Sequence, residues 1–331
     1  PHAAELRQAF PAPAEVGLWR SRKNEIFQFC ARGSVRHFTA ELDAYIQALY
    51  WDSLPQRLVN DRMLAEGALD GLKLLIMPDC YYVTQEEAAA LDRWVRAGGV
   101  LLCEAHLAGY NGTTGRHSRV LPGCGLAEAW GIREAETTSS FHLRLGRGHA
   151  TDAGSLTDDV RKALAAFGNA GGEHYPIRMA DGTLVWGAQR YAELAGEGRE
   201  PLGSFGGGAP CLARVRVGRG TVYYCGTNLG QAAERDPAGL LAVLRMAAAT
   251  AGVRPTGDLR AEAPGTVHLD ILSDGTGPRF AVVVSRADRA QSVQIEARGR
   301  WWGLFTGTKW ELDGATPVSV PAGYAEMFRI E

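Results

Sequence analysis

Three side chains with complementary chemistry follow one another at the end of an apolar segment, in the sequence VLLCEAH (100–106). A thiol, a carboxylate and an imidazole together can form a nucleophilic site, so Cys103, Glu104 and His106 are the candidate catalytic residues. A nucleophile at the end of a strand needs small neighbours, because the backbone turns tightly from the strand into a helix. Here Glu104 and His106 crowd that turn, the first glycine is Gly109, and strand alternation puts Cys103 and Glu104 on opposite faces. The sequence therefore predicts that the tight turn does not form, that Cys103 is a thiol of the core, and that the chain has no catalytic residue.

Cys124 and two histidines are the remaining candidates for chemistry. Cys124 has a glycine on each side, as a tight turn requires, but Leu121–Pro122 stands where an apolar strand should precede it, so a loop is predicted. The glycine clusters GNAGG and FGGGAP fit neither of the common phosphate-binding patterns. His142 and His149 flank LRLGRG without a carboxylate or a cysteine at metal-ligand spacing. We therefore predict no metal and no cofactor.

Tryptophan residues are the candidates for binding sugars by stacking. Trp94 and Trp186 lie in segments where packing in the core is the expected role. Trp301, Trp302 and Trp310, near the C-terminus, are left open between core packing and sugar binding.

The composition is that of an ordinary globular protein. The 331 residues suffice for about two domains, with 46% hydrophobic and 22% charged residues. A net charge of −2 gives no electrostatic reason to expect a nucleic acid or a membrane as partner. No apolar run approaches the roughly 20 residues of a transmembrane helix, and no signal peptide opens the chain. Six scattered cysteines without a C-x-x-C pair predict a reduced, cytoplasmic protein. The first residue is Pro1 rather than Met, so a fragment of a longer protein is expected.

Apolar strands alternate with amphipathic helices in the first third of the chain. Strands are predicted at 15–19, 57–61, 72–78 and 100–105. A polar loop follows the first strand, and a helix over 39–53 follows that loop. Thr84 and Glu87 form a capping box at the start of the next helix. This order predicts a parallel sheet covered on both faces, with Asp79–Cys80 at the same carboxyl edge as the CEAH segment.

The rest of the chain changes in character twice. Residues 111–210 are rich in glycine and lack a clear period, so long loops are predicted. Residues 213–228 are predicted to be a hairpin that turns at 218–220, and a capped helix begins at Asp236 and ends at Gly252. Beyond a linker the apolar period is two, which predicts a small all-β sandwich.

Taken in order, several segments resemble a known family. They are LKLLIMPDCYYVTQEEAAALDRWVRAGGVLLCEAHLAGY, LPGCGLAEAWGI, VWGAQRYAELA and VRVGRGTVYYCGTNL. They resemble the trimerisation domain of glycoside hydrolase family 42 β-galactosidases, which is similar in fold to class I glutamine amidotransferases. The final WWGLFTGTKWELDGATPVSVPAGYAEMFRI resembles the small β-domain that ends those enzymes. The resemblance covers roughly 14–331, with an insertion-like stretch around 136–180.

The resemblance implies a domain organisation and a function. Residues 1–13 are the stub of a preceding domain, 14–254 an amidotransferase-like (flavodoxin-like) α/β trimerisation domain, 255–265 a linker, and 266–331 a β-sandwich domain. In the family, two glutamates on a (β/α)₈ barrel hydrolyse β-galactosides with retention, and no barrel precedes this domain here. A homo-oligomer, suspected to be a trimer, is implied, and the carbohydrate substrate would bind the missing barrel.

The resemblance also bears on the nucleophile. Where an amidotransferase carries its reactive cysteine, this sequence has Glu104 or a neighbour of it, which implies a catalytically silent structural module. Two other functions stay open. One is a stand-alone, cysteine-dependent amidotransferase-like hydrolase that uses Cys103, Glu104 and His106. The other is a carbohydrate-binding or regulatory module whose aromatic residues face a cleft between domains.

Overall fold

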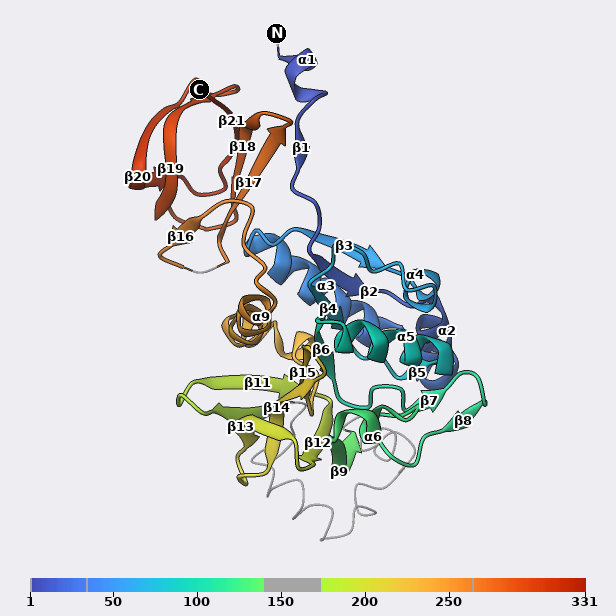
Figure 1. Cartoon of the computed structure of the whole chain (residues 1–331). Coiled ribbons are helices and arrows are strands. Elements are labelled where there is room, and N and C mark those ends of the chain that lie inside the picture. The colour runs from blue at the N-terminus through green and yellow to red at the C-terminus, as the bar shows by residue number, and fades with distance from the viewer. Residues whose placement is uncertain (1, 34, 140–173, 264) are drawn as a thin grey trace. The chain divides into compact units, whose positions relative to one another are not determined.

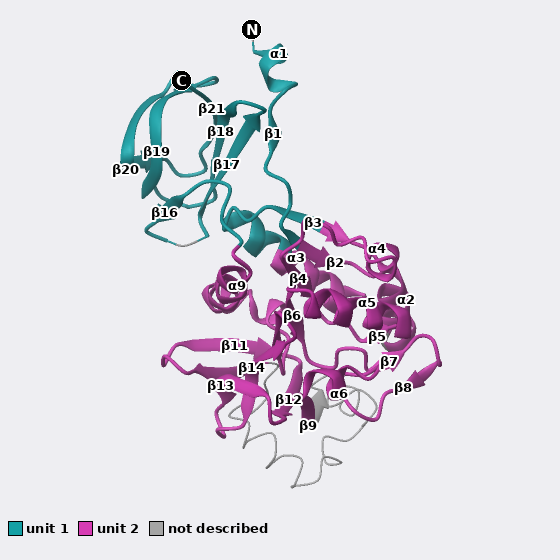
Figure 2. Cartoon of the chain, in the orientation of Figure 1, with its two compact units in different colours: residues 1–16, 46–57, 253–331 teal, residues 17–45, 58–252 magenta. Residues whose placement is uncertain are grey.

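The chain divides into two compact units in the computed structural model, which describes residues 2–33, 35–139, 174–263 and 265–331. We call residues 17–45 and 58–252 the α/β unit, and residues 1–16, 46–57 and 253–331 the β unit (Figure 2). This division differs from the predicted domains in placing 46–57 with the C-terminal strands.

The predicted stub and linker each contribute a strand to the β unit. Strand β1 (Phe10–Pro11) pairs with β17 (Val267–Asp274), and β16 (Leu259–Ala261) pairs with β19 (Gln291–Gly303). Both segments are therefore parts of a sheet rather than free connections.

A mixed sheet of nine strands forms the centre of the α/β unit (Figure 1). In spatial order the strands are β11 (Leu184–Ala188), β10 (His174–Met179), β13 (Arg199–Phe205), β14 (Pro210–Val217), β15 (Gly220–Cys225), β6 (Val100–Glu104), β4 (Leu74–Met77), β2 (Val16–Trp19) and β3 (Gln56–Val59). Strands β4 and β6 pair in parallel, as predicted, and β15 also pairs in parallel with β6. Strands β11, β10, β13, β14 and β15 pair antiparallel to their neighbours in this order. The sheet is not parallel throughout, because short turns such as the one at 218–220 can join only antiparallel neighbours.

Residues 174–205 are strands, so the prediction of long loops there is wrong. They form β10, β11, β13 and β12 (Arg190–Ala195), and β12 makes a separate two-stranded sheet with β9 (Arg133–Ser139). Glycine and proline interrupt the alternation of these short strands in the sequence, and hairpin pairing stabilises them nevertheless. Residues 140–173 of the insertion-like stretch lie outside the described part of the chain.

Local signals in the sequence predicted three of the described helices, those over 36–51, 85–96 and 237–251. The helices are α1 (Ala3–Leu6), α2 (Arg22–Arg32), α3 (Arg36–Trp51), α4 (Asp61–Ala65), α5 (Gln85–Arg96), α6 (Leu126–Trp130), α9 (Pro237–Ala251) and the 3₁₀ helix η1 (Gly230–Ala232). The capping box of Thr84 and Glu87 is present, Asp236 caps α9, and Gly252 ends it with a φ of 65°. Helix α2 stands where a polar loop was predicted.

The α/β unit has a core on each face of its sheet. Leu101 and Cys103 of β6 pack on one face with Leu91 and Val95 of α5. Leu102 and Glu104 point to the opposite face because side chains alternate along a strand, and α3 lies on that face. Beside β4, the short strands β5 (Tyr82–Val83), β7 (Tyr110–Asn111) and β8 (Arg116–His117) form a small separate sheet.

One continuous sheet, not a sandwich of two sheets, forms the β unit. Its strands are β1, β17, β18 (Gly277–Ser285), β21 (Ala325–Ile330), β19, β16 and β20 (Lys309–Val320). The long strand β19 pairs with β20, β21 and β16, so it joins the two halves that were expected to be separate. Trp301 is buried in this core, and Trp310 stacks on Phe328 with 4.2 Å between ring centroids. Trp301 and Trp310 are therefore packing residues, while Trp302 is half exposed beneath Lys309 Nζ.

Two further structural facts bear on the composition. All six cysteines lie in the described ranges and are free. Among the residues that the structure describes, no helix is long and apolar enough to cross a membrane.

Candidate functional site

Glu104 lies at the carboxyl end of β6 and is 1% exposed. One of its oxygens accepts hydrogen bonds from the Tyr45 hydroxyl at 2.8 Å and the Leu229 N–H at 2.9 Å. The other accepts from the Asp79 N–H and the side-chain amide of Asn228, both at 3.1 Å. A carboxylate has about four acceptor positions, and here four donors are present. Glu104 thus binds together α3, the end of β4 and the loop after β15.

A second buried carboxyl group, Glu41 of α3, lies beside Glu104. Its two oxygens accept from the backbone N–H groups of Gly230 at 2.5 Å and Gln231 at 2.8 Å, where η1 begins. Burial and the neighbouring Glu104 charge, to which Glu41 is hydrogen-bonded, raise the pKa of Glu41 well above its ordinary value. Glu41 therefore keeps its proton to a higher pH than an exposed glutamate does.

The raised pKa of Glu41 predicts a pH dependence of stability. Between the ordinary pKa of 4.5 and the raised value, the folded chain keeps a proton on Glu41 that the unfolded chain has released. The stabilisation of the folded state by this group therefore falls as the pH rises, by up to about 1.4 kcal/mol per pH unit. Glu41→Gln cannot ionise, so urea unfolding between pH 5 and pH 9 should show a flatter profile for this variant.

The control is Glu66→Gln, because Glu66 is an exposed residue that pairs with Arg62 on the surface of α4. Its profile should have the slope of the unmodified chain. Equal slopes for Glu41→Gln and the unmodified chain would show that Glu41 does not hold the extra proton.

Arg190 joins this site to a second group of buried side chains. Its guanidinium donates to Asp79 Oδ1 at 2.5 Å and to Nδ1 of His106, and it lies 5.2 Å from the ring centroid of Tyr81. Arg190 is 3% exposed and Asp79 is 3% exposed, so this is an ion pair in the interior. Because arginine can only donate, Nδ1 of His106 is the acceptor and its proton sits on Nε2.

Glu134 of β9 contacts His106 at its backbone N–H and on the Nε2 side of its ring. Its Oε1 accepts from the backbone N–H of His106 at 2.5 Å and from the Tyr224 hydroxyl at 2.6 Å, and its Oε2 lies 3.5 Å from Nε2 of His106. Burial raises the pKa of Glu134, and burial with the nearby Glu134 charge raises that of Tyr224. The imidazole is therefore held between an arginine and a carboxyl group.

The backbone does turn tightly after β6, although crowding was predicted there, but it leads into β7 and not into the helix that a strand-to-helix turn requires. His106 has a φ of 67° and Ala108 a φ of 55°, both in the left-handed region. The Gly109 N–H donates to the His106 carbonyl at 3.0 Å, and Glu134 accepts the His106 N–H. These bonds offset the strain that side chains impose on this backbone. A histidine occupies the turn, and the cysteine precedes it on the strand.

Cys103 lies in different surroundings from those of Glu104 and His106. Its Sγ lies 3.6 Å from the Tyr223 carbonyl, and the residue belongs to the apolar core against α5. Burial, with the Glu104 charge, raises the pKa of Cys103 well above its ordinary value, so the thiol stays protonated. The three predicted candidates are thus close in sequence, but Glu104 and His106 belong to the polar network and Cys103 to the core.

The other candidates are placed as follows. Cys124 lies in a loop with a φ of 55°, and burial raises its pKa to about 11. His142 and His149 lie outside the described residues. Within the described ranges, no group of three His, Cys, Asp or Glu side chains could hold a metal ion.

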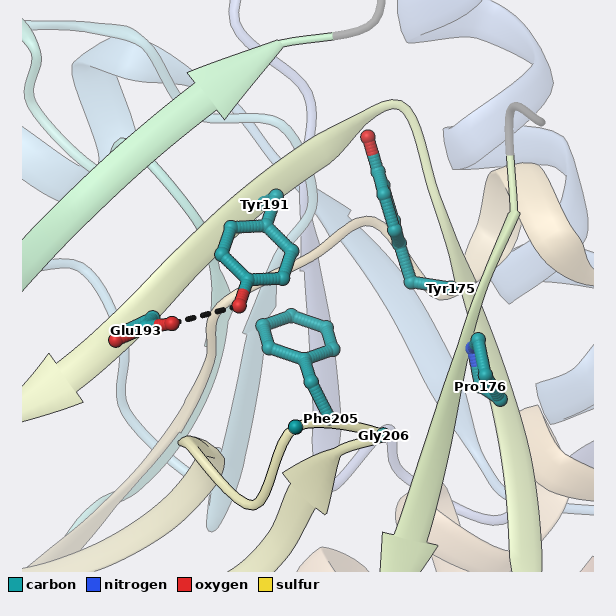
Figure 3. A pocket seen from close by; sticks show the side chains of 7 residues that line it. Tyr175, Pro176, Tyr191, Glu193, Phe205 and Gly206 are labelled. Atoms are coloured by element: carbon teal, nitrogen blue, oxygen red, sulfur yellow. Dashed lines mark hydrogen bonds between the residues drawn. The ribbon is translucent and has the colours of Figure 1, made fainter. Parts of the chain in front are cut away.

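A small pocket of about 190 Å³ lies among β10, β12 and β13 (Figure 3). Tyr175, Tyr191 and Phe205 line it, with Glu193 at one side accepting from the Tyr191 hydroxyl at 2.7 Å. Tyr191 and Phe205 stack on each other, with 4.1 Å between centroids and 18° between planes. Each of these two rings therefore has one face covered by the other, and burial raises the pKa of Tyr175 to about 12.

The sequence did not reveal the partners of Glu104. Glu41 was detectable, because it precedes Tyr45 by four residues on the inward face of the predicted helix, where a charged residue calls for a partner. Arg190 and Asn228 follow strands in distant parts of the chain, and only the folded sheet brings them to Asp79 and Glu104.

Comparison with known proteins places the chain in a family. The sequence model described as the β-galactosidase trimerisation domain matches residues 34–254. The chain belongs to this family. The match covers both parallel strands β4 and β6 and the polar network around Glu104.

Relatives of this trimerisation domain are longer proteins. β-Galactosidase BglY of Alicyclobacillus acidocaldarius is 26% identical over 274 residues, which are 78% of this chain and 33% of BglY. The fold is similar to that of Gan42B, a GH42 β-galactosidase from G. stearothermophilus, with a TM-score of 0.71 and 15% identity over 97% of this chain and 40% of Gan42B. It is also similar to the β-galactosidase from Bacillus circulans sp. alkalophilus, with a TM-score of 0.69 and 18% identity over 96% of this chain and 41% of that one. The chain thus spans about a third of the curated relative's length.

Proposed function

We propose that this chain is a non-catalytic module that assembles as a homotrimer and forms part of a β-galactosidase. The observation that carries the proposal is the match of residues 34–254 to the β-galactosidase trimerisation domain. Closed cyclic assemblies are the usual form of soluble homo-oligomers, and a trimer is one of them.

The polar network around Glu104 supports a structural role. In α/β sheets, ligands bind beyond the carboxyl ends of the strands, which is where β4 and β6 end here. At that edge the Glu104 carboxylate accepts four hydrogen bonds from the chain itself, and Arg190 joins Asp79 to His106. These groups hold α3, β6 and the loop after β15 together and leave no free acceptor on Glu104.

We further propose that the α/β unit is an amidotransferase-like scaffold in which Glu104 takes the place of the nucleophile. The parallel pairing of β4, β6 and β15 and the tight turn at His106 support this. The buried, protonated thiol of Cys103 argues for the silent form over a cysteine-dependent hydrolase.

The proposed parent enzyme hydrolyses β-galactosides on a separate barrel. Two glutamates there would act as acid/base and nucleophile, with retention at the sugar carbon. Carbohydrate would then reach the assembly through that barrel.

Sedimentation velocity and an aryl β-galactoside assay test the proposal. We expect the purified chain to sediment as a trimer at tens of micromolar and to release no aryl alcohol, because the described network has no open pair of carboxyl groups. A monomer at these concentrations would refute the assembly, and turnover that follows the chain through purification would refute the non-catalytic role.

A further inference from the structure

Helix α2 of the α/β unit has three polar residues on its buried face and two large apolar residues on its exposed face. The inward positions are Asn24, Glu25 and Gln28, which are 0%, 7% and 2% exposed. The outward positions include Ile26 and Phe29, which are 54% and 57% exposed, beside the exposed Arg22 and Lys23. A helix on the surface of a globular unit normally shows the reverse arrangement. Large apolar residues that gather on an outer face indicate a contact surface.

The inward face of α2 is polar because it binds the backbone after β4. The amide of Asn24 donates to the Asp79 carbonyl at 3.0 Å and accepts from the Tyr82 N–H at 2.9 Å. Gln28 donates to Asp79 Oδ2 at 3.2 Å. These bonds fix the rotation of α2 about its axis, so the exposure of Ile26 and Phe29 follows from the packing.

Aromatic rings extend the apolar face from α2 onto β5 and β7, which lie beside it (Figure 1). The Phe27 ring lies 4.5 Å from that of Tyr110 and 5.6 Å from that of Tyr82, centroid to centroid. Tyr82 and Tyr110 also stack on each other at 5.6 Å. All three rings are partly exposed. Half-buried tyrosine and phenylalanine are typical of interface cores.

We propose that the α2 surface, which we define as Ile26, Phe27, Phe29, Tyr82 and Tyr110, is where one copy of this chain contacts the next in the trimer. The proposal rests on the proposed function, because a trimerisation domain must present an apolar surface to another copy of itself. A ring of three needs two different surfaces on each copy, and the α2 surface is one of them. Arg22 lies beside it with a side chain that is 80% exposed, and it pairs with Glu25 of the same helix at 3.2 Å.

The test is sedimentation velocity of the double variant Ile26→Ser/Phe29→Ser against the unmodified chain. Both side chains point outward, so the folded unit should keep its circular dichroism spectrum. We expect the trimer to dissociate at concentrations at least about 30-fold higher than for the unmodified chain, the loss typical of interface hot spots. The matched control is Leu184→Ser on β11, which removes an apolar side chain that is 50% exposed elsewhere on the same unit.

Labelling of Cys30 gives an independent readout on the unmodified chain. Cys30 is an exposed cysteine on the same helix, whereas four of the others are buried and Cys124 is intermediate. We expect iodoacetamide to react with Cys30 more slowly above the trimer dissociation concentration than below it.

The outcomes separate the two proposals. A monomeric unmodified chain would refute trimerisation itself. An unmodified trimer whose double variant assembles equally well, or a Cys30 labelling rate that is independent of assembly, would refute the α2 surface alone. Dissociation by Leu184→Ser but not by the double variant would likewise assign the contact elsewhere.

Discussion

Glu104→Gln is expected to lower the free energy of unfolding by about 3 kcal/mol, although the two side chains have nearly the same shape. The glutamate accepts four hydrogen bonds at a position that is 1% exposed. In either orientation of the glutamine, its NH₂ group faces a backbone N–H, that of Leu229 or that of Asp79. Neither backbone group can turn away, so one buried donor loses its acceptor, at a cost of about 1–3 kcal/mol. The remaining bonds also lose the negative charge that strengthened them.

The measurement is urea unfolding followed by circular dichroism at one protein concentration, because assembly makes apparent stability depend on concentration. Glu66→Gln is again the matched control, since Glu66 and Arg62 form an exposed pair worth less than about 1 kcal/mol. If Glu104→Gln unfolded within 1 kcal/mol of the control, Glu104 would not bind the elements together as the hydrogen bonds indicate.

Elements with local signals could be predicted from the sequence, and elements without them could not. The side chain of Thr84 accepts from the backbone N–H of Glu87, and the side chain of Glu87 accepts from the backbone N–H of Thr84. This capping box spans only four residues, so the start of α5 could be predicted from the sequence. Helix α2 has an N-cap at Ser21, but its large apolar residues Ile26 and Phe29 lie on its exposed face. A helix prediction that looks in the sequence for an apolar buried face therefore does not find α2. Its true partner is the polar backbone around Asp79, which is 55 residues away from Asn24.

The candidate site shows the same division. The sequence located the edge of the sheet, because polar residues lie at or within two residues of the ends of the apolar strands that end at Met77 and Glu104. The sequence could not show that all hydrogen-bond acceptor positions of the Glu104 carboxylate are occupied, because some of the donors come from α3 and from the loop after β15. The crowding argument at His106 was correct about the strain, but it missed that the backbone turns there all the same, without leading into a helix. The carboxylate of Glu134, 28 residues away, supplies the hydrogen bond that holds the turn.

Arg190→Met is expected to lower the free energy of unfolding by about 3–5 kcal/mol, the largest effect that we predict for a single substitution. Methionine keeps much of the volume of the arginine but not its charge. Asp79, which is 3% exposed, would lose the cation 2.5 Å from its carboxylate, and His106 would lose the donor to its Nδ1. Removing one partner of a buried ion pair leaves an uncompensated charge in the interior, which is what makes such changes costly.

A double-variant cycle separates the loss of charge from the loss of packing. Asp79→Asn keeps the local geometry, because asparagine tolerates the left-handed φ of 42° that Asp79 adopts. In the chain with both substitutions the buried carboxylate that Arg190 paired with is also gone, so we expect it to be more stable than Arg190→Met alone, with a coupling energy of about 1–3 kcal/mol. Arg214→Met is the control, since Arg214 pairs with a half-exposed Glu200 on the surface. Strict additivity of the two substitutions would mean that Arg190 stabilises the fold through its contacts with Tyr81 and His106 and not through its charge on Asp79.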